Sequence, residues 1–263
     1  ADPAATTLAE AARRRSIVAD AEREAKARVG EPAVTRDGTR IGVMINVAAP
    51  SDVEGLDPAG CDGIGLVRTE FLVANGALRD EERQFALYRD LVRWAAGRPV
   101  TIRTLDAGGD KPIPGYTVAG EANPFLGMRG VRLSLRHPDV FRVQLRALVR
   151  AAASGPLKIM LPMVTAPAEL AQARALLQDA IASLQCGHVS AAAPPLGIMV
   201  EVPAAAIAVD QFDAAFYSIG SNDLVQYVTA SSRDSGGAAG LGELTHPAVL
   251  RLIAAVAAHG AAI

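Results

Sequence analysis

The sequence predicts an α/β fold with a helix-covered parallel sheet, most simply a (β/α)8 TIM barrel. Short, strongly apolar segments alternate with longer helical segments over most of the chain, which is typical of parallel strands joined by crossover helices. Six such units in the 263 residues fit most of a barrel of about 250 residues. An open doubly wound sheet is the alternative, and it is disfavoured because no predicted strand leads into a G-x-G-x-x-G turn.

The chain opens with a charged, Ala-rich helix predicted over residues 6–29. Thr7 and Glu10 have capping-box spacing, and Gly30 predicts the helix end. Its polarity on all sides suggests that it bridges to something outside this chain. Asp37-Gly38, between residues 33–36 and 39–43, then predicts a β-hairpin.

The remaining elements follow from the apolar pattern and from helix-start prolines. The predicted strands cover Ile41–Val47, Gly63–Val67, Val100–Leu105, Leu157–Met163, Leu196–Val202 and Ala215–Ile219. The predicted helices cover Glu81–Ala96, Pro138–Ala153, Pro167–Leu184 and Pro247–Ala258.

The end of the sequence predicts an incomplete barrel. Gly260 should stop the last helix, and residues 261–263 read as the opening of a seventh strand. A six-stranded barrel would leave two unpaired edges, which is an aggregation hazard. We therefore expect a barrel truncated after about six strands.

Composition excludes several classes of protein. A formal net charge of −2 argues against a general nucleic-acid binder. The two cysteines, Cys61 and Cys186, are too few for a disulfide framework, so we expect a reducing, cytoplasmic location. No signal segment and no apolar run of about 18–20 residues is present, so we expect no membrane insertion.

Ionic or amide side chains follow the predicted strands, and the carboxyl ends of barrel strands converge on one mouth. Fixed positive charge comes from Arg68, Arg103, Lys111 and Arg129. Arginine forks suit phosphate or carboxylate oxygens. Glu201 and Asp223 supply oxygen ligands for Mg²⁺. Together they predict a site for a small polyanion, most simply a phosphorylated carboxylic acid.

Each residue also has a plainer interpretation. A lone strand-end arginine is more often part of a rim salt bridge, and Lys111 could be a solvated loop residue. Glu201 could simply neutralise a nearby arginine, and Asn222-Asp223 could cap a helix. Their occurrence together, at the same end of successive strands, favours the site.

Six ordered segments carry a resemblance to a known family. They are GIGLVRTEFL (63–72), TIRTLDAGGDK (101–111), NPFLGMRGVRLSL (123–135), IMLPMV (159–164), GIMVEVPAA (197–205) and SIGSNDLVQY (218–227). With these segments the chain resembles the C-terminal barrel of enzyme I of the bacterial phosphoenolpyruvate:sugar phosphotransferase system. The resemblance implies a linker helix over 1–32 and a phosphoenolpyruvate-binding barrel over 33–263.

The resemblance also implies roles for individual residues. Arg68 and Arg103 would hold the phosphate of phosphoenolpyruvate, with Lys111 and Arg129 adding charge. Asn222 would line the substrate, and Arg233 would reach it from the loop at 231–240. Glu201 and Asp223 would ligate Mg²⁺.

The implied reaction moves the phosphoryl group to a histidine on a separate N-terminal domain and then to the carrier HPr, for sugar uptake. The resemblance also implies a homodimer. The family's proton-donating cysteine would lie beyond Ile263, and neither Cys61 nor Cys186 matches it. No catalytic residue is therefore expected within this sequence, which alone should be inactive. The alternatives are a related pyruvate phosphate dikinase or phosphoenolpyruvate synthase barrel, and a catalytically inactive dimerisation or sensing module.

Overall fold

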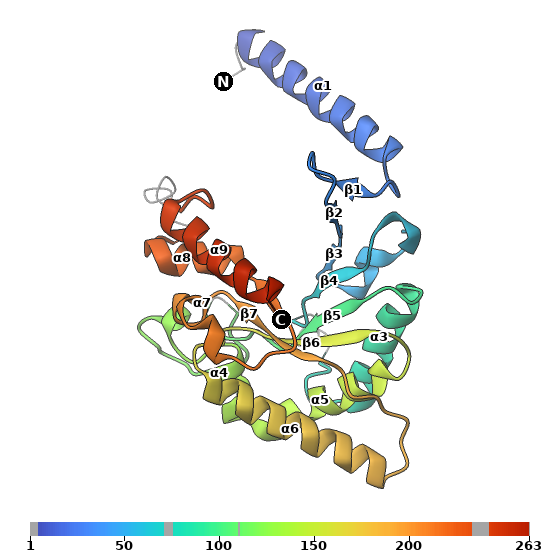
Figure 1. Cartoon of the computed structure of the whole chain (residues 1–263), viewed down its shortest axis with the longest axis vertical. Helices are drawn as coiled ribbons and strands as arrows, with labels where there is room; N and C mark the ends of the chain where they lie inside the picture. The colour runs from blue at the N-terminus through green and yellow to red at the C-terminus, as the bar shows by residue number, and fades with distance from the viewer. Residues whose placement is uncertain (1–4, 71–75, 110, 233–241, 263) are drawn as a thin grey trace.

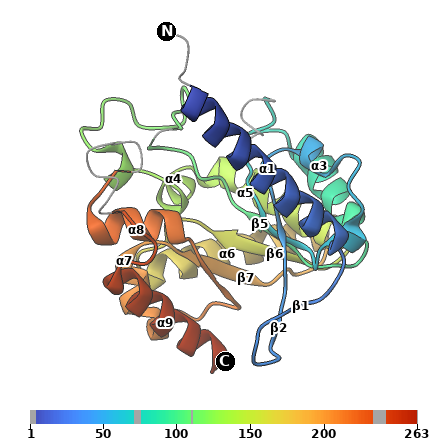
Figure 2. The same cartoon turned by 90° about the horizontal axis from the view of Figure 1, so that it is seen from above.

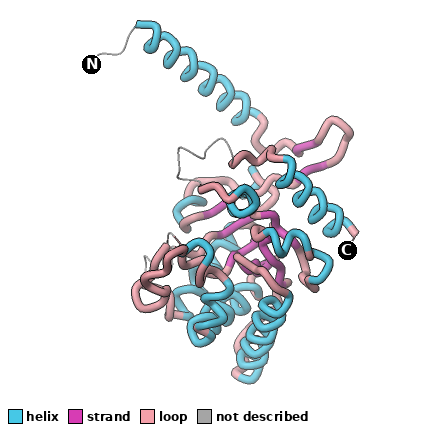
Figure 3. Tube along the Cα trace, turned by 90° about the vertical axis from the view of Figure 1, so that its left-hand side faces the viewer, coloured by secondary structure: helices cyan, strands magenta, loops and turns pink. Residues whose placement is uncertain are grey.

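A six-stranded parallel sheet lies at the centre of the molecule. The computed structural model describes residues 5–70, 76–109, 111–232 and 242–262. The strands are β3 (Ile45–Val47), β4 (Ile64–Val67), β5 (Val100–Arg103), β6 (Leu157–Leu161), β7 (Leu196–Val200) and β8 (Tyr217–Ile219). Figure 3 shows them grouped between the surrounding helices.

Each strand pairs in parallel with the next one in the sequence, in the order β3-β4-β5-β6-β7-β8. A doubly wound sheet would reverse its strand order at a switch point. The unbroken order is that of a barrel wound in one direction, so the predicted fold class is confirmed as a partial barrel of six strands. Because all six strands run the same way, their carboxyl ends share one edge.

Helices cover the outer face of this sheet, and α5 packs against both α3 and α6 (Figure 1). The α-helices after the first are α3 (Glu81–Trp94), α4 (Val131–Arg136), α5 (Pro138–Ala152), α6 (Pro167–Cys186), α7 (Pro203–Ile207), α8 (Ser221–Thr229) and α9 (Pro247–Ala261). The short 3-10 helices are η1 (Pro50–Val53), η2 (Pro58–Gly60), η3 (Pro124–Leu126) and η4 (Val209–Gln211). None of the helices in these ranges is both long and apolar enough to cross a membrane.

Local sequence explains where the helices begin. Asp80 caps α3, because its carboxylate accepts the Arg83 backbone N–H at 3.0 Å. A proline opens α5, α6 and α9, where its missing N–H costs no hydrogen bond. His246 caps α9, because its Nδ1 accepts the Ala248 N–H at 3.2 Å.

The core is the interface between the sheet and these helices. Every residue of β5 and of β7 is buried, as expected for strands covered on both faces. Buried side chains of α5, such as Leu145 and Leu148, belong to the same hydrophobic cluster as Ile102 and Ile159 from the strands.

The first helix, α1 (Ala5–Ala27), stands apart from the sheet in Figure 1, and in the view from above in Figure 2 it passes in front of the rest of the chain. Its apolar side chains Leu8, Ile17 and Val18 are each more than half exposed. The capping-box prediction was wrong, because the helix begins at Ala5 and places Thr7 inside its first turn. Alanine is the best helix former, so the helix extends upstream without that cap.

The predicted hairpin is confirmed as β1 (Ala33–Val34) paired antiparallel with β2 (Arg40–Ile41). The continuous strand predicted from Ile41 to Val47 was wrong, because residues 42–44 separate β2 from β3. In this link the Asp62 carboxylate, rather than a neighbouring strand, accepts the Val43 backbone N–H at 2.8 Å.

The predicted end of the last helix was also wrong. Helix α9 continues through Gly260 to Ala261, so Ala261 does not open a strand. A glycine inside a helix costs only about 1 kcal/mol relative to alanine, so it weakens the helix without ending it.

Close contact between β7 and β8 gives a test of the fold. A Cβ at Gly197 would lie 2.5 Å from the Phe216 ring and its carbonyl oxygen. Gly197→Ala should therefore lower the free energy of unfolding by about 1–3 kcal/mol through overpacking. The matched control is Gly42→Ala, since a Cβ there meets nothing within 4 Å. Urea unfolding that shows equal stability for the two variants would contradict this packing.

Candidate functional site

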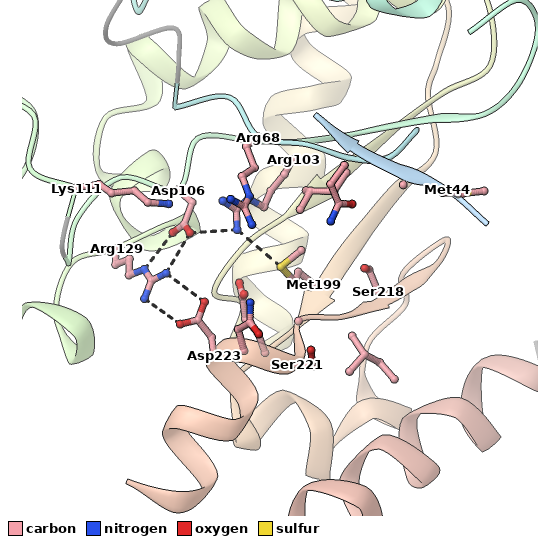
Figure 4. A pocket seen from close by; sticks show the side chains of 17 residues that line it. Met44, Arg68, Arg103, Asp106, Lys111, Arg129, Met199, Ser218, Ser221 and Asp223 are labelled. Atoms are coloured by element: carbon pink, nitrogen blue, oxygen red, sulfur yellow. Dashed lines mark hydrogen bonds and ion pairs between the residues drawn. The ribbon is translucent and has the colours of Figure 1, made fainter. Parts of the chain in front are cut away.

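A polar cavity of about 480 Å³ opens at the carboxyl edge of the sheet. It is lined by Met44, Asn46, Gly65, Leu66, Arg68, Arg103, Asp106, Lys111, Arg129, Met199, Glu201, Ser218, Ile219, Gly220, Ser221, Asn222 and Asp223. Figure 4 shows several of these side chains pointing toward one another from different strands and loops.

A chain of buried ion pairs crosses this edge. Arg129 forms a two-point contact with Asp106, with both N···O distances at 3.1 Å. Its other side faces Asp223 at 3.3 and 3.4 Å, so the guanidinium bridges the two carboxylates (Figure 4). Arg103 continues the chain, since its Nη1 lies 3.2 Å from Asp106 and its Nη2 lies 2.5 Å from Glu70.

The charged forms of these groups are favoured despite their burial. Burial alone would raise the pKa of Asp106, which is 1% exposed, but the Arg103 and Arg129 charges outweigh it and hold that pKa below its usual value. The pKa of Arg129 is raised, because its contacts with Asp106 and Asp223 outweigh its desolvation. Buried charges persist only when they are paired in this way.

Glu201 behaves differently from the other buried carboxylates. It makes no direct ion pair with any described residue and instead accepts the Met163 backbone N–H at 2.7 Å. Its desolvation, followed by the negative charge of Asp106 and reinforced by that of Asp223, raises its pKa from 4.5 to about 8. The charge of Arg103 only partly offsets these effects. Glu201 is thus a buried carboxylate that lacks a sufficient positive partner.

Tight backbone geometry holds Glu201 in place. Met163 adopts a φ of +58°, an uncommon conformation for a residue with a side chain, and presents its N–H to the carboxylate. A Cβ at Gly220 would lie 2.7 Å from the Glu201 Cβ and 2.9 Å from the Met199 Cγ. Only glycine therefore lets the end of β8 approach Glu201 so closely.

Arg68 and Asn222 line the cavity with exposed side chains. The Arg68 guanidinium makes no ion pair within the described ranges, although its backbone N–H is anchored to Val47 O at 2.8 Å. Lys111 is partly exposed and lies 3.1 Å from Glu70. Arg68 is therefore available to a ligand without breaking an existing pair.

The structure brings seven of the eight sequence-predicted site residues around one cavity, and Arg233 lies outside the described residues. Their roles toward a ligand stay predictions. The alternative in which Glu201 only neutralises an arginine is not what the geometry shows. The alternative cap at Asn222-Asp223 is also not observed, because Gly220 is the N-cap and both residues lie in the first turn of α8.

Sequence reasoning did not assign Glu70 or Asp106 to the site. Both lie within three residues of a predicted arginine, and that spacing was their available signal. The hydrogen bond from the Met163 N–H could not be predicted, because residue types do not reveal the backbone conformation that directs this group.

The residues present fit a divalent cation held jointly with a ligand. No group of three or more His, Cys, Asp or Glu side chains among the described residues could hold a metal by itself. Glu201 and Asp223 both line this cavity, as does Asp106, which is held at both oxygens by Arg129. Mg²⁺ usually takes one or two carboxylates and completes its shell with substrate oxygens and water. The insufficiently neutralised Glu201 fits that arrangement.

Comparisons with known proteins agree with this chemistry. The model of the PEP-binding domain of PEP-utilising enzymes, where PEP is phosphoenolpyruvate, matches residues 22–262. A phosphoenolpyruvate-protein phosphotransferase from Geobacillus stearothermophilus is 46% identical over 237 residues, which are 88% of this chain and 41% of the relative. The corresponding protein from Bacillus subtilis (strain 168) is 39% identical over 98% of this chain and 46% of its own length. The chain thus spans less than half the length of these curated relatives.

A solved citrate lyase from Burkholderia xenovorans LB400 shares 19% identity, with a TM-score of 0.49 over 88% of this chain and 62% of its own. At that score the likeness supports no inference about this chain.

The raised pKa of Glu201 predicts a pH-dependent stability. Between about pH 4.5 and 8 the folded state keeps a proton on Glu201 that the unfolded state has lost. Stability should therefore fall as pH rises through this window, by at most about 1.4 kcal/mol per pH unit from this group. Glu201→Gln should flatten that slope in urea unfolding curves measured from pH 5 to 8.

The control is Glu82→Gln. The hydrogen bond from Arg150 lowers the pKa of Glu82, so its titration lies below this window and its substitution should leave the slope unchanged. If Glu201→Gln also leaves the slope unchanged, Glu201 is already ionised at pH 5 and the electrostatic description of the site is wrong.

Proposed function

The chain belongs to the family of PEP-binding domains of PEP-utilising enzymes, and we propose that it serves a phosphoenolpyruvate-protein phosphotransferase. In this proposal it binds phosphoenolpyruvate and Mg²⁺ and donates the phosphoryl group to a histidine on a separate N-terminal domain. The carrier HPr then takes the group for sugar uptake. The observation that carries the proposal is the gathering of Arg68, Arg103, Lys111 and Arg129 with the Glu201 and Asp223 carboxylates around one cavity.

Substrate binding would depend on charge. Phosphoenolpyruvate presents a phosphate of about −1.5 to −2 near neutral pH together with a carboxylate. Guanidinium groups bind such oxygens in pairs of hydrogen bonds. Arg68 would approach the phosphate from the open side of the cavity, and Arg103 would approach it from the buried side.

Transfer would then depend mainly on positioning the reactants and neutralising the charge of the phosphoryl group, with little covalent chemistry from the protein. A phosphoryl group in transit spreads negative charge over its oxygens. Arg103 and Arg129 are held by buried ion pairs before a ligand arrives, so little reorganisation of these two is needed at the moment of reaction. The acceptor histidine would approach from the open side, in line with the enolate oxygen.

Glu201 and Asp223 would hold Mg²⁺. When bound, the ion would neutralise charge on the phosphate and enolate oxygens. The Met163 N–H would keep Glu201 oriented toward the cavity. Neither Cys61 nor Cys186 lines this cavity.

Residues 1–32 would connect the barrel to the phosphohistidine domain, which fits the exposure of the described side chains of α1. We also propose a cytoplasmic homodimer.

Among the alternatives, a dikinase or synthase would need a nucleotide-binding domain in the same protein. The curated relatives reported above carry the phosphotransferase name, which favours the phosphotransferase reading over the dikinase, the synthase and an inactive module.

Arg68 provides a test of substrate binding that is separable from stability. Arg68→Gln should weaken phosphoenolpyruvate binding to the intact protein by about 1.5–3 kcal/mol, the range for a hydrogen bond to a charged group. Its urea unfolding midpoint should stay unchanged, because Arg68 makes no ion pair within the described ranges. Arg36→Gln, on the exposed hairpin, is the control. Unchanged calorimetric affinity for Arg68→Gln would exclude Arg68 from the binding site.

Metal dependence tests the carboxylates. Phosphoenolpyruvate should bind more tightly when Mg²⁺ replaces a chelator, and Glu201→Gln should remove most of that difference, since an amide is a weaker ligand for Mg²⁺. Glu82→Gln, at a site remote from the cavity, should keep the wild-type Mg²⁺ effect. An undiminished effect in Glu201→Gln would show that Glu201 does not bind the ion.

A further inference from the structure

Glu70 lies where two of the cavity's cations converge. A single oxygen of its side chain, Oε1, is 2.5 Å from Arg103 Nη2 and 3.1 Å from Lys111 Nζ. Two cationic donors on one oxygen are also the arrangement that binds a phosphate or carboxylate oxygen of a ligand. The Glu70 carboxylate therefore has the position and charge that a ligand's anionic group would need.

Among the described residues Arg103 has two carboxylate partners, Glu70 and Asp106, and Glu70 is the less firmly held of the two. Asp106 is 1% exposed and is held at both oxygens by Arg129. The Glu70 side chain is 21% exposed. Its second oxygen is buried without a hydrogen-bond partner, and so is Arg103 Nε. A carboxylate satisfied at only one oxygen is held less firmly than one satisfied at both.

The balance of charges in the site also favours the departure of Glu70 when a ligand binds. Four carboxylates, Glu70, Asp106, Glu201 and Asp223, face four cations, Arg68, Arg103, Lys111 and Arg129. Among the described residues, no net positive charge is left for a polyanion when all four carboxylates are ionised. A ligand of about −3 with one Mg²⁺ adds about one negative charge. Removing Glu70 from the cations would offset that addition.

We propose that Glu70 is an internal anion that occupies the substrate's anion subsite and is displaced when the phosphate of the substrate binds to Arg103 and Lys111. The proposal rests on the proposed function for the identity of the substrate. Before displacement, Glu70 keeps the two cations aligned and close together. It also makes every ligand compete with a carboxylate of the protein, which favours ligands with more charge than one carboxylate.

The test is calorimetric titration of the intact wild-type protein and of Glu70→Gln with phosphoenolpyruvate and, separately, with inorganic phosphate, at fixed Mg²⁺. Glutamine keeps the shape of the side chain and removes its charge, so the competitor is weakened. Both ligands should bind about tenfold more tightly to Glu70→Gln, the scale of one charge-assisted hydrogen bond. Glu82→Gln is the control and should bind both ligands with wild-type affinity.

Weaker or unchanged binding of both ligands by Glu70→Gln would overturn the proposal, since Glu70 would then support Arg103 and Lys111 in the complex. If wild type does not bind phosphoenolpyruvate but Glu70→Gln binds inorganic phosphate more tightly than wild type, the proposed function fails and the displaced-anion role stands. If neither protein binds either ligand, both fail.

A second measurement needs no variant. A crystal structure of the wild-type protein with phosphoenolpyruvate should show Glu70 Oε1 moved away from Arg103 Nη2, with a phosphate oxygen in its place. A complex in which Glu70 keeps its 2.5 Å contact with Arg103 would overturn the proposal, even if Glu70→Gln does not fold.

Discussion

A buried chain of alternating charges holds the carboxyl edge of the sheet together. It runs from Glu70 through Arg103, Asp106 and Arg129 to Asp223. It thereby joins the ends of β4 and β5, the segment before α4 and the first turn of α8. Removing such charges from water costs several kcal/mol for each ion unless partners replace the water. The geometry of the site therefore depends on the alternation, and loss of an internal member would leave buried charge uncompensated.

Two groups of the cavity stand outside this balance. Arg68 has no ionic partner within the described ranges, and Glu201 lacks sufficient positive charge. One is a cation open to the cavity, and the other is a buried carboxyl group whose ionised form lacks a sufficient partner. An incoming phosphate and an incoming cation would satisfy both at once. The paired residues thus maintain the shape of the site, and the incompletely paired residues determine what it takes up.

Small residues and unusual backbone conformations make that geometry possible. Gly220 allows β8 to end beside Glu201, and Gly197 allows β7 and β8 to pack closely. Met163 accepts a positive φ and so directs its N–H at Glu201. Gly220 and Met163 carry no charge, yet they position the Glu201 carboxylate, which we propose as a ligand of Mg²⁺.

The parallel sheet could be predicted from residue types alone, because buried strands and crossover helices each leave a local apolar pattern. Residue types also predicted that ionic residues gather at one edge, because strand ends are local features and parallel strands share their direction. The continuous strand predicted over 41–47 was wrong, because the Asp62 carboxylate accepts the Val43 N–H in place of a strand partner. The helix end predicted at Gly260 was wrong, because α9 tolerates that glycine. Which charges pair could not be predicted in this way and follows from the three-dimensional fold. Arg129 and Asp223 are 94 residues apart, and the energy of an ion pair depends on distance and burial that no local pattern contains.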